Sequence, residues 1–106
     1  MPRSKQVIPV EEYVLDVLMR DVVGHDKRPA AFIVYLHLYG LVARGHWAPV
    51  AASLRDIGEA TGLSKSAVQN ALHVLQRREL VVTRRKNRTA APERRVLRRW
   101  AASARR

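Results

Sequence analysis

Two glycines placed four residues apart most limit what this chain can fold into. Gly58 lies in a segment with helical apolar spacing that begins at Ser53, a residue suited to cap a helix, and Gly62 ends that pattern. Ser64 can cap the next helix, which we expect to run to about residue 79. Two short helices that cross steeply need a small residue where they touch and a glycine at the turn. The spacing therefore predicts two helices joined by a tight turn. The apolar stripe of the second consists of Val68, Ala71, Leu72 and Leu75.

Two further helices are expected upstream. Residues 9–23 carry apolar side chains at steps of three and four, with Val14 and Leu18 on the stripe. Residues 29–43 are apolar around most of the circumference, so this helix should be covered on several sides. Residues 50–52 could form a short strand. Tyr13, Tyr35, Tyr39 and Trp47 could line an effector pocket, although packing in the core or at an interface is favoured.

The segment after residue 79 reads as a β-hairpin. Residues 80–85 are rich in β-branched side chains, residues 86–92 form a loop, and residues 93–100 should return as a second strand. The predicted fold class is mainly α with a small β-hairpin (α+β). It has a three-helix core and an extra N-terminal helix.

The stretch from Ser53 to Val81 closely resembles the helix-turn-helix of bacterial and phage winged-helix DNA-binding domains, and residues 82–97 resemble their wing. The resemblance covers roughly residues 29–100. One departure is Gly58, where such motifs most often carry alanine. We therefore divide the chain into an N-terminal arm and helix (residues 1–28), a winged helix-turn-helix domain (29–100) and a basic tail (101–106).

The charge is concentrated near the C-terminus. The chain carries a net charge of +11, and residues 84–106 hold ten basic residues against the single acid Glu93. Such a block attracts polyanions. A solvated basic tail is the alternative, but it does not explain why acidic partners are nearly absent from the hairpin.

The second helix of the motif, residues 64–79, presents a polar face. Gln and Asn pair with adenine in the major groove, and Ser and Lys can reach bases or phosphates. The resemblance implies that this helix enters the major groove, with its N-terminal half leading. The expected DNA-binding residues are Ser64, Lys65, Ser66, Gln69, Asn70, His73 and Arg77.

The wing, residues 80–100, supplies a second set of candidates. In winged-helix relatives, basic residues there grip phosphates or reach into the minor groove. The expected residues are Arg84, Arg85, Lys86, Arg88, Arg94 and Arg95.

These features predict sequence-specific binding of double-stranded DNA by a bacterial or phage transcriptional regulator. Residues 9–23 are expected either to form a dimer contact or to pack across the first core helix. In a twofold homodimer, the two recognition helices would be spaced to enter successive major grooves. Two alternatives stay open: the DNA-binding part of a replication-initiation or partition protein, and a winged-helix adaptor that binds proteins.

Other classes of function receive little support. The chain has no cysteine, and its four histidines lack the spacing of a metal site. No nucleophile–base pattern or phosphate-binding glycine loop is present, so we expect no enzyme activity and no cofactor. No signal peptide or membrane-spanning stretch is evident, and a cytoplasmic location is expected.

Overall fold

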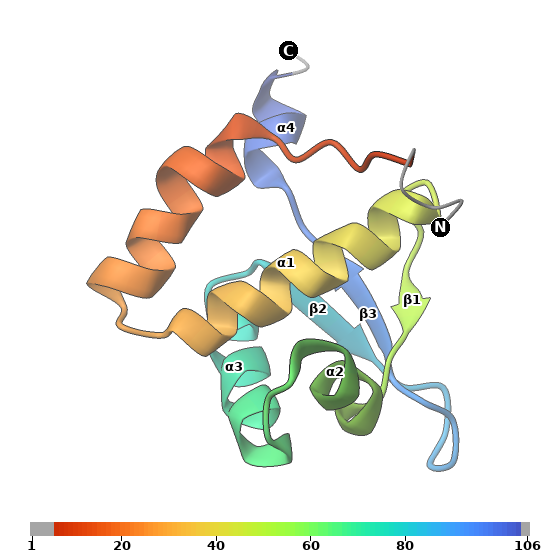
Figure 1. Cartoon of the computed structure of the whole chain (residues 1–106). Coiled ribbons are helices and arrows are strands. Elements are labelled where there is room, and N and C mark those ends of the chain that lie inside the picture. Colours follow the sequence, from red (N-terminus) through yellow and green to blue (C-terminus); the bar gives the residue numbers. More distant parts are fainter. Residues whose placement is uncertain (1–5, 105–106) are drawn as a thin grey trace.

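The computed structural model describes residues 6–104, with side chains through residue 101. A helical core carries a small antiparallel sheet on one side, as the winged helix-turn-helix fold requires (Figure 1). Among these residues, no helix is long and apolar enough to cross a membrane. The elements are η2 Val14–Leu18, η3 Arg20–His25, α1 Pro29–Arg44, β1 Val50–Ala51, α2 Leu54–Thr61, α3 Lys65–Arg77, β2 Val81–Arg84, β3 Glu93–Val96 and α4 Arg99–Ala104.

The N-terminal helix spans residues 12–25 and is mostly π-helical, with the Asp26 N–H donating to the Asp21 carbonyl at 2.8 Å. It starts three residues later than expected, and it packs on α1. Val14, Leu18 and Val22 are buried in the core cluster of the protomer itself. Of the two roles expected for this helix, these contacts fit packing across the first core helix. Val14 and Leu18 do not form a surface through which a partner could bind.

Helix α1 is the centre of the core, as its nearly continuous apolar circumference predicts. Its aromatic side chains pack rather than line an open pocket: Tyr35 and Tyr39 are each 1% exposed. The Tyr39 ring meets Trp47 edge-on at a centroid distance of 5.0 Å. The Tyr39 hydroxyl donates to Glu11 Oε1 at 2.9 Å, which fastens the chain before the N-terminal helix to α1.

The hairpin is part of a three-stranded sheet with strand order β1-β3-β2, all antiparallel. β3 pairs with β1 at Val50 and Ala51, so the expected short strand is present and completes the sheet. β2 and β3 form the wing. They pair from Val81 with Val96 to Arg84 with Glu93, a register that fixes which side chains share a face.

The returning strand ends at Val96, four residues earlier than expected. Arg98 instead leaves the sheet and donates to Glu11 Oε1 at 3.1 Å, while its guanidinium lies 3.6 Å from the centre of the Trp47 ring. Trp100 then belongs to α4 and stacks on Tyr13 at 4.5 Å. The expected tail at residues 101–106 is thus helical through residue 104, and residues 105–106 lie outside the described residues.

Candidate nucleic-acid interface

The turn between α2 and α3 is built as the glycine spacing predicts. Gly62 has φ 80°, and its N–H donates to the Gly58 carbonyl at 2.8 Å. A Cβ at Gly58 would lie 3.0 Å from the carbonyl oxygen of Leu63, so the backbone of the turn comes unusually close to α2 here. This contact explains why glycine occupies a position where alanine is usual.

The start of α2 is fixed by a reciprocal cap. Ser53 Oγ accepts from the Asp56 N–H at 3.0 Å, and the Asp56 carboxylate accepts from the Ser53 N–H at 3.2 Å. The hydrogen bond from the Ser53 N–H, and then the Ser53 hydroxyl, lower the pKa of the Asp56 carboxyl below its usual value. The cap matters for the interface because it anchors the first helix of the motif at the end of the strand that joins the wing sheet.

Helix α3 has one buried face and one exposed face. Ser64 caps the helix with Oγ accepting from the Ala67 N–H at 3.1 Å, and α3 itself runs from Lys65 to Arg77, two residues shorter than expected at its C-terminal end. Its inner residues, including Val74 in addition to the predicted stripe, belong to the core. The expected site residues are all exposed on this helix or at its cap: Ser64, Lys65, Ser66, Gln69, Asn70, His73 and Arg77.

The wing separates its basic residues by strand alternation. Arg84 and Arg95 are exposed on one face of the sheet, whereas Thr83 and Arg94 pair on the other. Arg94 is 4% exposed and donates through Nε to the Ala52 carbonyl at 2.9 Å and through Nη1 to Thr83 Oγ1 at 3.0 Å. The expectation that Arg94 lies at the DNA-facing surface is therefore wrong. It ties the wing to the residue before the α2 cap.

The loop at the tip of the wing is organised by its own side chains. Arg85 Nη1 donates to the Ala90 carbonyl at 2.9 Å. Asn87 Oδ1 accepts from the Ala90 N–H at 2.8 Å and the Thr89 N–H at 3.0 Å. Asn87 was not a sequence candidate, although an asparagine in a short loop is a known turn signal. Lys86 and Arg88 are exposed at this tip, and the nearest Glu93 oxygen is 4.0 Å from Lys86 Nζ.

A cleft of about 1090 Å³ lies between the helix-turn-helix and the wing. Its lining includes the exposed basic side chains of Arg55, Lys65 and Arg85, from α2, α3 and the wing loop, while the buried Arg94 forms part of its wall. Glu59 also lines the cleft and pairs with Arg55 at 3.1 Å. The remaining positive charge makes this side of the molecule attractive to a polyanion.

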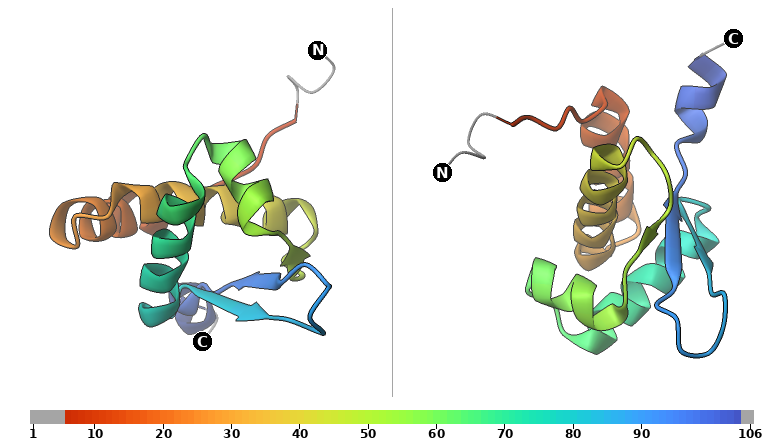
Figure 2. Two further views of the ribbon diagram at one scale, coloured as in Figure 1. Left: turned by 90° about the horizontal axis from the view of Figure 1, so that it is seen from below. Right: turned by 90° about the vertical axis from the view of Figure 1, so that its right-hand side faces the viewer.

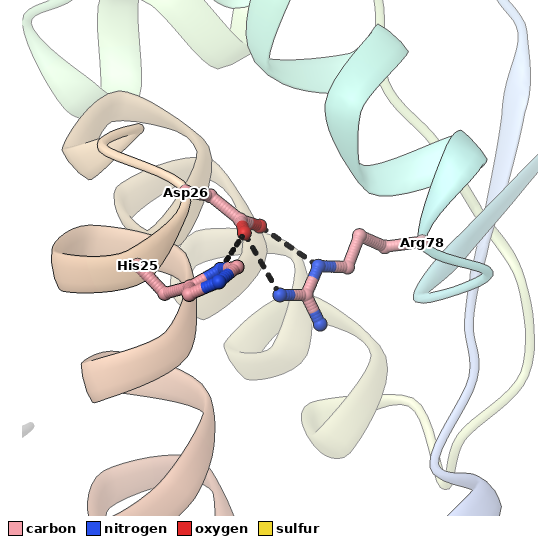
Figure 3. A network of polar contacts seen from close by, with 3 residues as sticks. All are labelled: His25, Asp26 and Arg78. Atoms are coloured by element: carbon pink, nitrogen blue, oxygen red, sulfur yellow. Dashed lines mark hydrogen bonds and ion pairs between the residues drawn. The ribbon is translucent and has the colours of Figure 1, made fainter.

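An ion pair that the sequence did not reveal joins the N-terminal helix to the end of α3 (Figure 3). The Asp26 carboxylate accepts from Arg78 Nε at 2.8 Å and Arg78 Nη2 at 3.0 Å, and it also contacts His25 Nδ1 at 3.1 Å. The hydrogen bonds from Arg78 and then His25 lower the pKa of Asp26 to about 2. The pair spans 52 residues of sequence, so no local pattern could have predicted it.

A comparison with known protein families places part of the chain in a described family. The model of the MarR family matches residues 35–91, which include most of α1, the helix-turn-helix and the wing through its tip. No curated protein and no solved structure matches the chain significantly.

The Asp26–Arg78 pair gives stability a defined dependence on pH. The pKa of Asp26 is lowered from 3.8 to about 2, so its contribution is complete above the unfolded value and is lost as the pH falls through about 2. Because both side chains are partly exposed, we expect the substitution Asp26→Asn to lower the free energy of unfolding by about 1 kcal/mol at neutral pH. Urea unfolding should show the two proteins converging between about pH 4 and pH 2. A difference that persists at the acid end would contradict this assignment.

Proposed function

The chain belongs to the MarR family of bacterial transcriptional regulators, and we propose that it binds a specific sequence of double-stranded DNA. In this proposal α3 enters the major groove and the wing lies on the sugar–phosphate backbone or in the minor groove. Family membership favours a regulator of transcription over a replication-initiation protein, a partition protein or a protein adaptor. As a DNA-binding regulator it would act in the cytoplasm.

One observation carries the proposal: α3 buries one whole face in the core and leaves a polar face with side chains suited to bases. Among the described residues, Gln69 and Asn70 are exposed and make no side-chain hydrogen bond. Their amides are therefore free to pair with base edges. The proposed contacts from this helix are Ser64, Lys65, Ser66, Gln69, Asn70, His73 and Arg77, with Ser64 acting through its position at the helix N-terminus.

The wing residues divide into two proposed groups. Lys86 and Arg88 lie in the tip loop and are proposed to contact phosphates directly. Arg84 and Arg95, on the exposed face of the sheet, add attraction at longer range. Arg85 holds the tip loop through its contact with Ala90, so its removal would also change the loop's shape. Arg94 is proposed to act only by holding the wing in place.

We also propose a twofold homodimer, with a different contact from the one the apolar stripe suggested. Leu15, Met19 and Val23 follow one another at four-residue steps on the N-terminal helix and are 36–47% exposed. Tyr13 of that helix is also exposed but stacks on Trp100, which leaves these three side chains to meet a second copy. Such a dimer would set two α3 helices roughly 34–36 Å apart, the spacing of successive major grooves.

The reading of bases is tested by truncating the amides. We expect Asn70→Ala or Gln69→Ala to lose roughly 1–3 kcal/mol of binding free energy on the preferred sequence and almost none on random DNA. Gln76→Ala, the same kind of truncation near the other end of α3, is the matched control and should retain specificity. The affinity of each variant for the preferred sequence and for random DNA is measured by fluorescence anisotropy. Equal losses on the two DNAs would mean that these side chains do not read bases.

The role of the wing tip is tested by its salt dependence. Each phosphate contact contributes about 0.9 to the slope of log affinity against log salt. We expect Lys86→Gln with Arg88→Gln to make the slope shallower by about two units and to weaken specific and random binding alike. The control is Arg20→Gln with Arg44→Gln, which removes the same charge from the N-terminal helix and from the C-terminal end of α1. A parental slope in the tip variant would exclude direct contact.

The dimer contact is tested by sedimentation. We expect Leu15→Asp with Met19→Asp to give a folded monomer, because both side chains are exposed in the protomer. Val14→Asp with Leu18→Asp should instead unfold the chain, because it places charges in the core. A Leu15/Met19 variant that remains dimeric would show that the copies meet elsewhere.

A further inference from the structure

A second basic surface lies beside α3, on the side away from the wing. A groove of about 460 Å³ runs between α3 and the start of α1. It is lined by Lys27 and Arg28, which precede α1, and by Arg77 on α3. Viewed from below, the loop before α1 and the wing lie on opposite sides of α3 (Figure 2, left). We call Lys27, Arg28 and Arg77 the basic flank.

The positive charge of the basic flank is not neutralised within the protomer. Among the residues that the structure describes, no carboxylate lies within 4.0 Å of any of its three side chains. The adjacent acid, Asp26, is already occupied by Arg78 and His25. α1 begins there without a side-chain cap or an acid in its first turn, so the positive end of its dipole adds to the same charge.

The flank is also held in a defined position. The Arg28 N–H donates to the Val22 carbonyl at 2.9 Å, and Asp26 pairs with Arg78 just beyond the end of α3 (Figure 3). Lys27 between them has φ 58°, a conformation that an unconstrained lysine rarely adopts. The loop is therefore fastened to both neighbouring helices, and little ordering would be needed for it to bind a ligand.

The groove is continuous with the face of α3 proposed to read bases. Asn70 and His73 line the groove and also belong to that exposed face. The major groove is bounded by phosphate backbones on both sides, about 12 Å apart. A helix lying in it with the wing against one backbone brings its opposite side towards the other. The ligand that fits an unneutralised basic surface at this place is a phosphodiester.

We propose that the basic flank is a second phosphate-binding site, which grips the DNA backbone on the side of α3 opposite the wing. It rests on the proposed DNA binding and adds Lys27 and Arg28 to the interface. The Asp26–Arg78 pair acts as the positioning contact that sets these two side chains beside Arg77. DNA is thus held on both sides of α3.

The test compares Lys27→Gln with Arg28→Gln against the charge-matched control Arg20→Gln with Arg44→Gln. All four side chains are exposed, so both variants should fold, and thermal unfolding checks this. We expect the flank variant to make the salt slope shallower by about 1.8 units and to weaken binding at least about tenfold in about 0.1 M salt. The control should change the slope by far less than the value of about 0.9 that one phosphate contact contributes.

A second measurement locates the contact on the DNA. Single neutral methylphosphonates are placed in turn along the preferred duplex, and affinity is measured for the parental protein and the flank variant. We expect the parental protein to be sensitive to phosphates on both sides of the α3 contact, and the variant to lose its sensitivity on the side away from the wing only.

The outcomes separate this proposal from the one on which it rests. A parental protein that binds DNA while the flank variant keeps the same slope and the same sensitive phosphates would overturn the basic flank and leave DNA binding intact. An equal loss in the control would also overturn it, because the effect would then be one of net charge. A parental protein that shows no affinity for DNA would contradict the proposed function itself.

Discussion

The burial of one face of α3 against α1 is the contact on which the rest of the structure depends. Val68, Ala71 and Leu75 contribute to the same core as Val34 and Leu38, and each is 3% exposed or less. Because 13 residues of helix are held rigidly on this side, the opposite side keeps a fixed arrangement of polar groups. A binding surface built on a packed helix loses little entropy when a ligand arrives. The turn at Gly58 and Gly62 serves this contact by bringing α2 close enough to support the start of α3.

Among the described residues, basic side chains lie on both sides of this helix. The wing and the cleft carry them on one side, and the basic flank carries them on the other. Other basic side chains make contacts inside the protomer that hold its elements together. Arg94 ties the wing to the start of α2, Arg98 joins the base of the wing to Glu11 and Trp47, and Arg78 fixes the loop before α1. Some arginines thus hold the elements of the interface in place, whereas others are proposed to contact DNA directly.

The sequence predicted the order and type of the elements up to β3, though not α4, because their signals are local. Capping serines, the two glycines and the apolar stripe of α3 act within one or two turns of helix, and the structure confirms each of them. Arg94 was misassigned although a local signal existed: it alternates with Arg95 along a strand, so one of the two had to point inward. The pairs Asp26–Arg78 and Glu11–Arg98 join residues 52 and 87 positions apart, and only the three-dimensional packing brings them together. The early end of β3 has the same cause, because Arg98 is drawn away from the sheet towards Glu11.

Selection of bound sequences from a random DNA pool tests most directly whether α3 reads base pairs in the major groove. We expect a defined consensus made of two inverted half-sites about 10–10.5 base pairs apart, as two copies related by a twofold axis require. A pool that is retained but shows no enriched sequence after repeated rounds would contradict it, because binding would then rest on backbone charge alone.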